Sequence, residues 1–137
     1  MSAQIAPRRI SESRPQLAIE RVEVFGVAVP LVGGGFKNAY VTKTVQKSAV
    51  VRLVAAGGAV GLGNIDPSPG YSAETIDASL AALRDKLAPG VIGLDAANIH
   101  VLNARLDAVA PGFLDAKAVI EMACVDLTAR ALGVLAS

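Results

Sequence analysis

Alternating apolar and polar residues early in the chain predict a β-strand over residues 19–31. Valines alternate there with charged residues such as Arg21 and Glu23, a pattern that is typical of a strand with one buried face. The alternation changes sense around Phe25-Gly26, so we expect a β-bulge at that point.

Two more valine-rich runs, 45–55 and 59–65, predict further strands. Only Ala56-Gly57-Gly58 separates them, and glycines in so short a connection are typical of a hairpin turn. We therefore expect three antiparallel strands in the first half of the chain.

In the second half, apolar residues recur at the 3.6-residue period of a helix. Three helical faces result, formed by Ile76, Leu80, Leu83 and Leu87, by Ile99, Leu102, Leu106 and Val109, and by Val119, Met122, Ala123 and Leu127. Each face follows a residue with a side-chain oxygen, so the expected N-caps are Ser72, Asp95 and Asp115. Pro89-Gly90 and Pro111-Gly112 are expected to end the first two helices, and Gly133 the third.

All predicted strands precede all predicted helices. Such separate runs favour an α+β fold, a three-stranded antiparallel meander followed by three helices, over a parallel βαβ sheet. Residues 1–18 are polar, with two prolines and three arginines, and lie outside this pattern. We expect them to form a flexible N-terminal tail or, alternatively, a peptide that docks on a partner subunit.

Two connections carry the better functional signal. The segment 32–44 opens with three glycines and contains Phe36, Lys37 and Tyr40, and the segment 64–72 contains Ile65, Asp66 and Tyr71. Loops of this mixed apolar and polar character can close over a site, exclude water and select a substrate. On composition alone, both segments could equally be simple connections.

Composition and charge exclude several classes of function. The chain is 53% apolar and 18% charged with a net charge of +1, which gives no basis for binding nucleic acid or an anionic membrane. One cysteine excludes an internal disulfide and favours a reducing compartment. No apolar run approaches the roughly 20 residues of a membrane span, so we expect a soluble, cytoplasmic protein.

The residues that could carry chemistry do not form a catalytic pattern. His100, the only histidine, lies off the apolar helix face, and Cys124 lies in a small, apolar stretch typical of inert packing. The glycines at 57, 58, 61 and 63 match no phosphate-binding motif and fit hairpin and turn roles. Most carboxylates fit helix starts or solvated positions, but Glu121 and Asp126 are spaced so that they could face a neighbouring domain.

Three stretches resemble one enzyme family. The strand 19–31, the hairpin 49–64 with its Gly61-Leu-Gly63, and the closing helix 116–133 are similar, in order and spacing, to the N-terminal domain of mandelate racemase/muconate lactonizing enzymes of the enolase superfamily. The family often has an aromatic residue where Val125 stands, and it usually continues beyond the closing helix into a barrel, whereas this chain ends at Ser137.

The resemblance implies a capping domain that folds over the mouth of a C-terminal (β/α)-barrel. Its two loops would help to choose a carboxylate substrate, and Phe36, Tyr40, Ile65 and Asp66 are the residues that we expect to line the lid. In the family, Mg²⁺ and the acid/base groups that remove a proton next to a carboxylate are held by barrel residues. Lys43 and Lys47 do not form the family's Lys-x-Lys pair, so no catalytic or metal-binding residue is expected in this chain.

The resemblance also divides the chain into a tail (1–18), a capping domain (19–114) and a closing helix leading toward the barrel (115–137). The chain alone is expected to bind no cofactor and to be inactive, although its parent family is enzymatic. Expected partners are the barrel domain, the substrate of the parent enzyme and further copies in a homo-oligomer. The alternative is a non-catalytic, self-associating interaction module, a truncated product whose apolar faces pair with one another.

Overall fold

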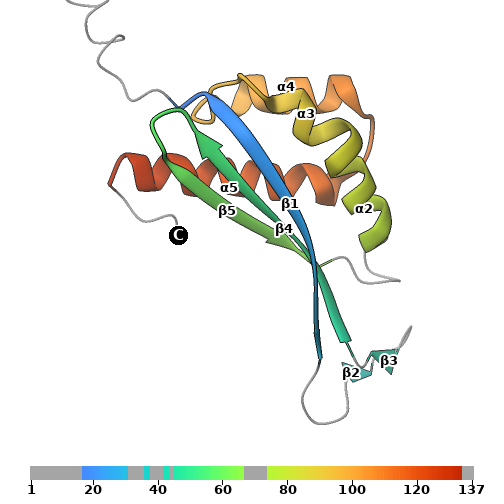
Figure 1. The fold of residues 1–137 in the computed structure, drawn as a ribbon. Helices are drawn as coiled ribbons and strands as arrows, with labels where there is room; N and C mark the ends of the chain where they lie inside the picture. Colours follow the sequence, from blue (N-terminus) through green and yellow to red (C-terminus); the bar gives the residue numbers. More distant parts are fainter. Residues whose placement is uncertain (1–16, 31–35, 38–41, 44, 67–73, 134–137) are drawn as a thin grey trace, which may run out of the picture.

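The computed structural model describes residues 17–30, 36–37, 42–43, 45–66 and 74–133. A three-stranded antiparallel sheet forms one layer, with strands β1 (Ile19–Pro30), β4 (Val45–Ala55) and β5 (Val60–Ile65) in the order β1-β4-β5. A separate two-stranded ladder pairs β2 (Phe36–Lys37) with β3 (Thr42–Lys43). The helices cover one face of the larger sheet (Figure 1), which confirms the predicted α+β class.

The helical layer contains α2 (Ile76–Ala82), a π-helical segment η1 (Leu83–Leu87), α3 (Ala88–Val91), α4 (Ile99–Val109) and α5 (Leu114–Ala131). The prediction that Pro89-Gly90 ends the first helix is wrong, because helical backbone continues to Val91. The π-helical turn explains this. Ala88 N–H donates to Leu83 O, five residues back, and Pro89, which has no N–H, then falls in the first turn of α3 where a donor is not needed.

The core lies between the sheet and the helices. Alternate residues of the central strand β4, namely Ala49, Val51, Leu53 and Ala55, are buried against the helical layer. Helix α5 runs along β5 and places Val119, Ala123 and Leu127 in the same core, as the helical period predicted. The fourth residue of that predicted face, Met122, is instead 45% exposed, because it stands beside the outer edge of β5.

The first predicted N-cap is wrong. Thr75 caps α2 by accepting a hydrogen bond from Ala78 N–H at 3.1 Å, and Ser72 lies outside the described residues. The error is one of position only, since both residues offer a hydroxyl and the sequence does not show which of them stands at the helix start.

The other two caps also differ from the prediction. Asn98 caps α4 by accepting from Val101 N–H at 3.1 Å, while Asp95 accepts from Ala97 N–H in the preceding turn. At α5 the residue before the helix is Phe113, in the left-handed region with φ of 53°, and Asp115 lies in the first turn. Gly133 does follow the helix with φ of 77°, as predicted.

The predicted β-bulge is misplaced. Phe25 pairs with Val50 and Gly26 with Ala49 in regular register, and the irregularity lies between Ile19 and Arg21. The alternation changes sense near Phe25 for another reason: Phe25 is apolar but lies on the sheet face that carries no helices, where it is 45% exposed.

Candidate functional site

The predicted lid segments leave the sheet at one end. Strand β5 stops at Ile65, which pairs with Ala49, whereas β1 and β4 continue to the pair Pro30–Val45. Residues 27–30 and 45–48 therefore form a two-stranded arm, which no third strand supports among the described residues. Figure 1 shows this arm projecting beyond the helical layer, with β2 and β3 at its far end.

The structure places the four predicted lid residues unequally. Ile65 ends β5 and packs, half-buried, against the core, and Asp66 follows it as an exposed residue at the base of the arm. The backbone of Phe36 pairs with Lys43 in the β2–β3 ladder, and Tyr40 lies outside the described residues. Ile65 and Asp66 are thus brought together, while their grouping with Phe36 and Tyr40 into one site stays a prediction.

A small hollow of about 190 Å³ lies where the arm meets the helical layer. Its walls come from β1, β4 and the start of α2, with apolar groups from Ile76 and Leu80 and opposite charges from Lys47 and Asp77. No local sequence pattern indicates this hollow, because three segments far apart along the chain form it.

Glu74, the first described residue after the second lid segment, ties two helices together. One of its carboxylate oxygens accepts a hydrogen bond from Asp115 N–H at 2.7 Å, and the other accepts from the buried hydroxyl of Ser79. Glu74 therefore joins the start of α2 to the first turn of α5. An acid before a helix predicts a local effect on the helix end, but its bond to a residue 41 positions away was not foreseeable.

The two carboxylates whose spacing would allow them to face a neighbouring domain are both hydrogen-bonded within this one. Glu121 accepts a hydrogen bond from the Asn103 side chain at 2.8 Å. Asp126 accepts from Leu62 N–H at 2.9 Å and pairs with Arg130 at 3.0 Å. The backbone hydrogen bond, and to a lesser extent Arg130, lower the pKa of the Asp126 carboxyl.

The remaining candidate groups lie in separate environments. Cys124 is buried, as predicted, and burial, with smaller effects from Glu121 and Asp95, raises the pKa of its thiol to about 12. His100 is exposed on α4.

Within the described ranges, no three His, Cys, Asp or Glu residues are grouped to hold a metal ion, so these side chains do not fit a magnesium site. None of the helices described is long and apolar enough to cross a membrane.

Comparison with known proteins gives a consistent match. The family model described as "Mandelate racemase / muconate lactonizing enzyme, N-terminal domain" matches residues 20–136. An L-Ala-D/L-Glu epimerase from Bacillus subtilis is 31% identical over 117 residues, which are 85% of this chain and 32% of the epimerase. A chloromuconate cycloisomerase from Cupriavidus necator is 38% identical over 89 residues, which are 64% of this chain and 24% of that enzyme.

Solved structures agree with the sequence matches. A muconate lactonizing enzyme from Pseudomonas fluorescens, complexed with muconolactone, superposes with a TM-score of 0.79 at 32% identity, over 87% of this chain and 32% of that one. The substrate-liganded epimerase from Bacillus subtilis gives 0.76 at 31% identity, over 85% and 32%. This chain therefore spans about a third of the length of the relatives that it matches.

Proposed function

Because the chain belongs to the mandelate racemase/muconate lactonizing enzyme family, as its N-terminal domain, we propose that it is the capping domain of an enolase-superfamily enzyme. In this proposal it closes over a C-terminal barrel and supplies the loops that choose the substrate. The parent reaction would be a racemisation, epimerisation, cycloisomerisation or dehydration that removes a proton next to a carboxylate.

The two-stranded arm carries this proposal. The arm projects from a packed body, and Asp66 stands exposed at its base. The ends of β1, β4 and β5 show that both predicted lid segments leave the sheet at the same end. A lid in this position can exclude water and contact the variable part of a substrate without entering the chemistry.

Magnesium enters the proposal only through the parent enzyme. Bound in the barrel, the ion would stabilise the negative charge that forms on the substrate carboxylate when its neighbouring proton is removed. Because the described residues of this chain offer no ligand set for it, their part is confined to enclosing the substrate and selecting it.

A chimera tests the lid role. The matching N-terminal third of the Bacillus subtilis epimerase is replaced by residues 20–136, and kcat/KM is measured for several dipeptides. We expect a folded, active chimera whose ratio of kcat/KM between dipeptides differs from that of the native epimerase. Within the chimera, Asp66→Ala should change that ratio by about fivefold, the effect of one lost contact of roughly 1 kcal/mol.

Lys86→Ala is the matched control, because Lys86 is an exposed charge on η1, outside the predicted lid. It should leave the ratio unchanged. A chimera that folds by circular dichroism but shows the native preference, unaltered by Asp66→Ala, would reject the lid role.

Self-association is the second candidate function, and the open sheet face favours it. Phe25, Val27 and Leu62 are apolar and 45%, 38% and 45% exposed on this face. Exposed apolar groups that lie close together often mark a contact surface. Light scattering on the purified chain distinguishes the two cases, since a monomer at high concentration contradicts a self-associating module.

A further inference from the structure

The two outer edges of the sheet differ in how they are covered. On β5, Leu62 N–H donates to Asp126 and Asn64 N–H reaches the sulfur of Met122, at 2.9 and 3.4 Å. Side chains of α5 thus occupy two of the outward backbone donors of this strand. Unpaired edge strands invite a further strand to pair, and covering an edge is one way by which proteins prevent it.

The edge of β1 is covered only at its beginning. Ile19 N–H donates to Leu94 O and Ile19 O accepts from Gly93 N–H, both at 2.8 Å, so the backbone of Ile19 faces away from β4. The irregularity that follows inserts Glu20 as an extra residue. An inserted residue resets the alternation of a strand, so Arg21, not Glu20, next faces β4.

The pairing across the sheet gives the same orientation. Because the N–H groups of Leu62 and Asn64 face outward, their neighbours on β5 face β4, and the alternate residues Val50, Arg52 and Val54 of β4 face β1. Their partners are Phe25, Glu23 and Arg21. The backbone groups of Val22 and Val24 therefore point to the outer edge, and no described residue hydrogen-bonds to them there.

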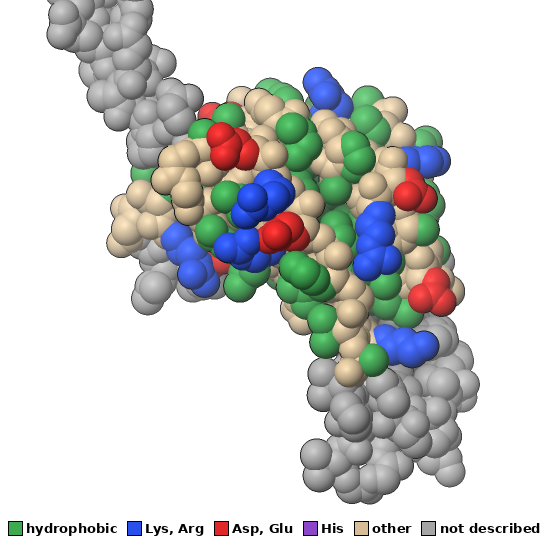
Figure 2. All heavy atoms as spheres, in the orientation of Figure 1, with side chains coloured by type: hydrophobic (Ala, Val, Ile, Leu, Met, Phe, Trp, Pro, Cys, Tyr) green, Lys and Arg blue, Asp and Glu red, His purple; other side chains and the backbone are tan. Residues whose placement is uncertain are grey.

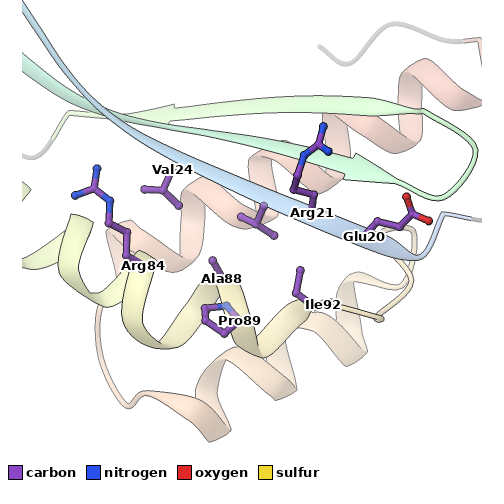
Figure 3. Close-up of a pocket in the computed structure, with 8 residues that line it drawn as sticks. Glu20, Arg21, Val24, Arg84, Ala88, Pro89 and Ile92 are labelled. Carbon is purple, nitrogen blue, oxygen red and sulfur yellow. The ribbon is translucent and has the colours of Figure 1, made fainter.

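A groove of about 380 Å³ runs beside this free edge, between β1 and the helical segment η1–α3. Figure 3 shows Val24 on the strand side and Ala88, Pro89 and Ile92 on the helix side. Ile92 is 46% exposed although it is a large apolar residue. Unpaired backbone groups beside an apolar trough are what an extended peptide needs when it adds to a sheet.

The charge of the groove indicates what kind of peptide fits. Arg84 lines it next to Val24 (Figure 3), is exposed, and forms no ion pair with a described carboxylate. Arg21, which is paired with Glu23, and the acidic Glu20 also line the groove, at the end away from Arg84 (Figure 3). In Figure 2, hydrophobic side chains lie between cationic ones on this side of the molecule. An acidic residue in the added strand would give Arg84 a partner.

A second copy of the chain fits this edge less well. Antiparallel pairing of β1 with its own copy about Val24 would bring the two Arg84 side chains toward each other across the symmetry axis. Like charges in such a position oppose association.

We propose that the free edge of β1 at Val22 and Val24, together with the η1–α3 groove, is a docking site for an extended, acidic peptide segment of another protein. The peptide would pair its backbone with the strand, place apolar side chains against Ala88 and Ile92, and set a carboxylate beside Arg84. This site does not include Ile65 or Asp66, the lid residues at the base of the arm, and is independent of the lid role.

Nuclear magnetic resonance on the ¹⁵N-labelled 137-residue chain tests the proposal. The probe is a blocked seven-residue peptide of alternating valine and threonine with a central glutamate, and its twin carries a central lysine. We expect the glutamate peptide to shift the amide signals of Val22 and Val24 and to slow their hydrogen exchange. Arg84→Glu should weaken its binding about fivefold and favour the lysine peptide, whereas Lys86→Glu on the same segment should leave the preference unchanged.

Backbone pairing is tested separately from charge. Methylation of the peptide nitrogens that face the strand should abolish the shifts at Val22 and Val24. Retained binding of the methylated peptide, shifts confined to the open sheet face, or equal binding of both twins would each overturn the proposal. Concentration-dependent shifts at Val22 and Val24 without peptide would show a second copy at the edge, and would overturn it as well.

Discussion

At the scale of single residues, two glycines decide how closely α5 approaches the sheet. A Cβ atom on Gly61 would overlap the carbonyl oxygen of Ala123, and one on Gly63 would overlap that of Val119. Helix backbone thus rests directly on strand backbone at both positions. Glycine is required at both positions because no side chain fits there, and not because the backbone adopts a conformation that favours glycine.

We therefore expect Gly63→Ala to lower the free energy of unfolding by about 2 kcal/mol or more, because α5 must move away from β5. Urea unfolding followed by circular dichroism measures this loss. Gly26→Ala is the control, since its Cβ would meet only the end of the flexible Leu80 side chain, at 3.0 Å. A similar loss in both variants would contradict the explanation by backbone contact.

Asp126 makes stability depend on pH. Its pKa is lowered in the folded protein, mainly by the hydrogen bond from Leu62 N–H, so the unfolded chain binds the proton more tightly. The stability contributed by the carboxylate is complete above the unfolded pKa of about 3.9 and is lost as the pH falls through the lower folded pKa.

Asp126→Asn keeps a hydrogen-bond acceptor but removes the charge. We expect it to cost about 1 kcal/mol at neutral pH, and the difference from the native chain to shrink below about pH 4. Urea unfolding at both pH values measures the difference. A cost that did not change with pH would show that the charge contributes nothing.

At the scale of elements, Glu74 links the beginnings of α2 and α5. Glu74→Ala would leave Asp115 N–H without its acceptor and the buried Ser79 hydroxyl without its partner. We expect a loss of about 1–3 kcal/mol and faster hydrogen exchange at the Asp115 amide. Asp77→Ala, a change of an exposed acid in the first turn of α2, should cost less than about 0.5 kcal/mol. Equal effects would reject the link.

The elements themselves were largely predictable from the sequence, whereas their ends were not. Period-two and period-3.6 patterns report which side of a strand or helix is buried, so β1, β4 and β5 were expected within a residue of their observed bounds. Each helix start offered more than one capping residue, and tertiary packing chose between them. Pro89 misled the prediction because a single π-helical turn accommodates it.

Of the predicted lid, only the place where its segments leave the sheet could be compared with the structure. Glycines and prolines mark these segments, and β5 ends at Ile65 as they indicated, whereas a lid role for Ile65 and Asp66 stays a prediction. Contacts such as Glu74 with Asp115 join residues far apart in sequence, and no local pattern encodes them. The free edge of β1 was missed for the same reason, since it depends on which neighbours the other elements leave uncovered.

At the scale of the whole molecule, one buried thiol reports on global unfolding. Cys124 lies in the shared core of sheet and helices, and burial raises its pKa to about 12. We expect iodoacetamide to label the folded chain negligibly at pH near 8, because the Cys124 thiol is protonated at this pH and the reagent cannot reach it. Labelling should rise with urea in parallel with the loss of circular dichroism. Rapid labelling without urea would show that the core opens locally.

The core that holds Cys124 belongs to the body of the molecule and not to the two-stranded arm. Within the part of the chain that the structure describes, residues 27–30 and 45–48 pair only with each other, and two strands without a third are marginally stable in water. The arm therefore draws little on the core that holds Cys124. Substitutions there can accumulate with little effect on the melting temperature of the domain, so under the proposed lid role a change of specificity would not require the fold to be rebuilt.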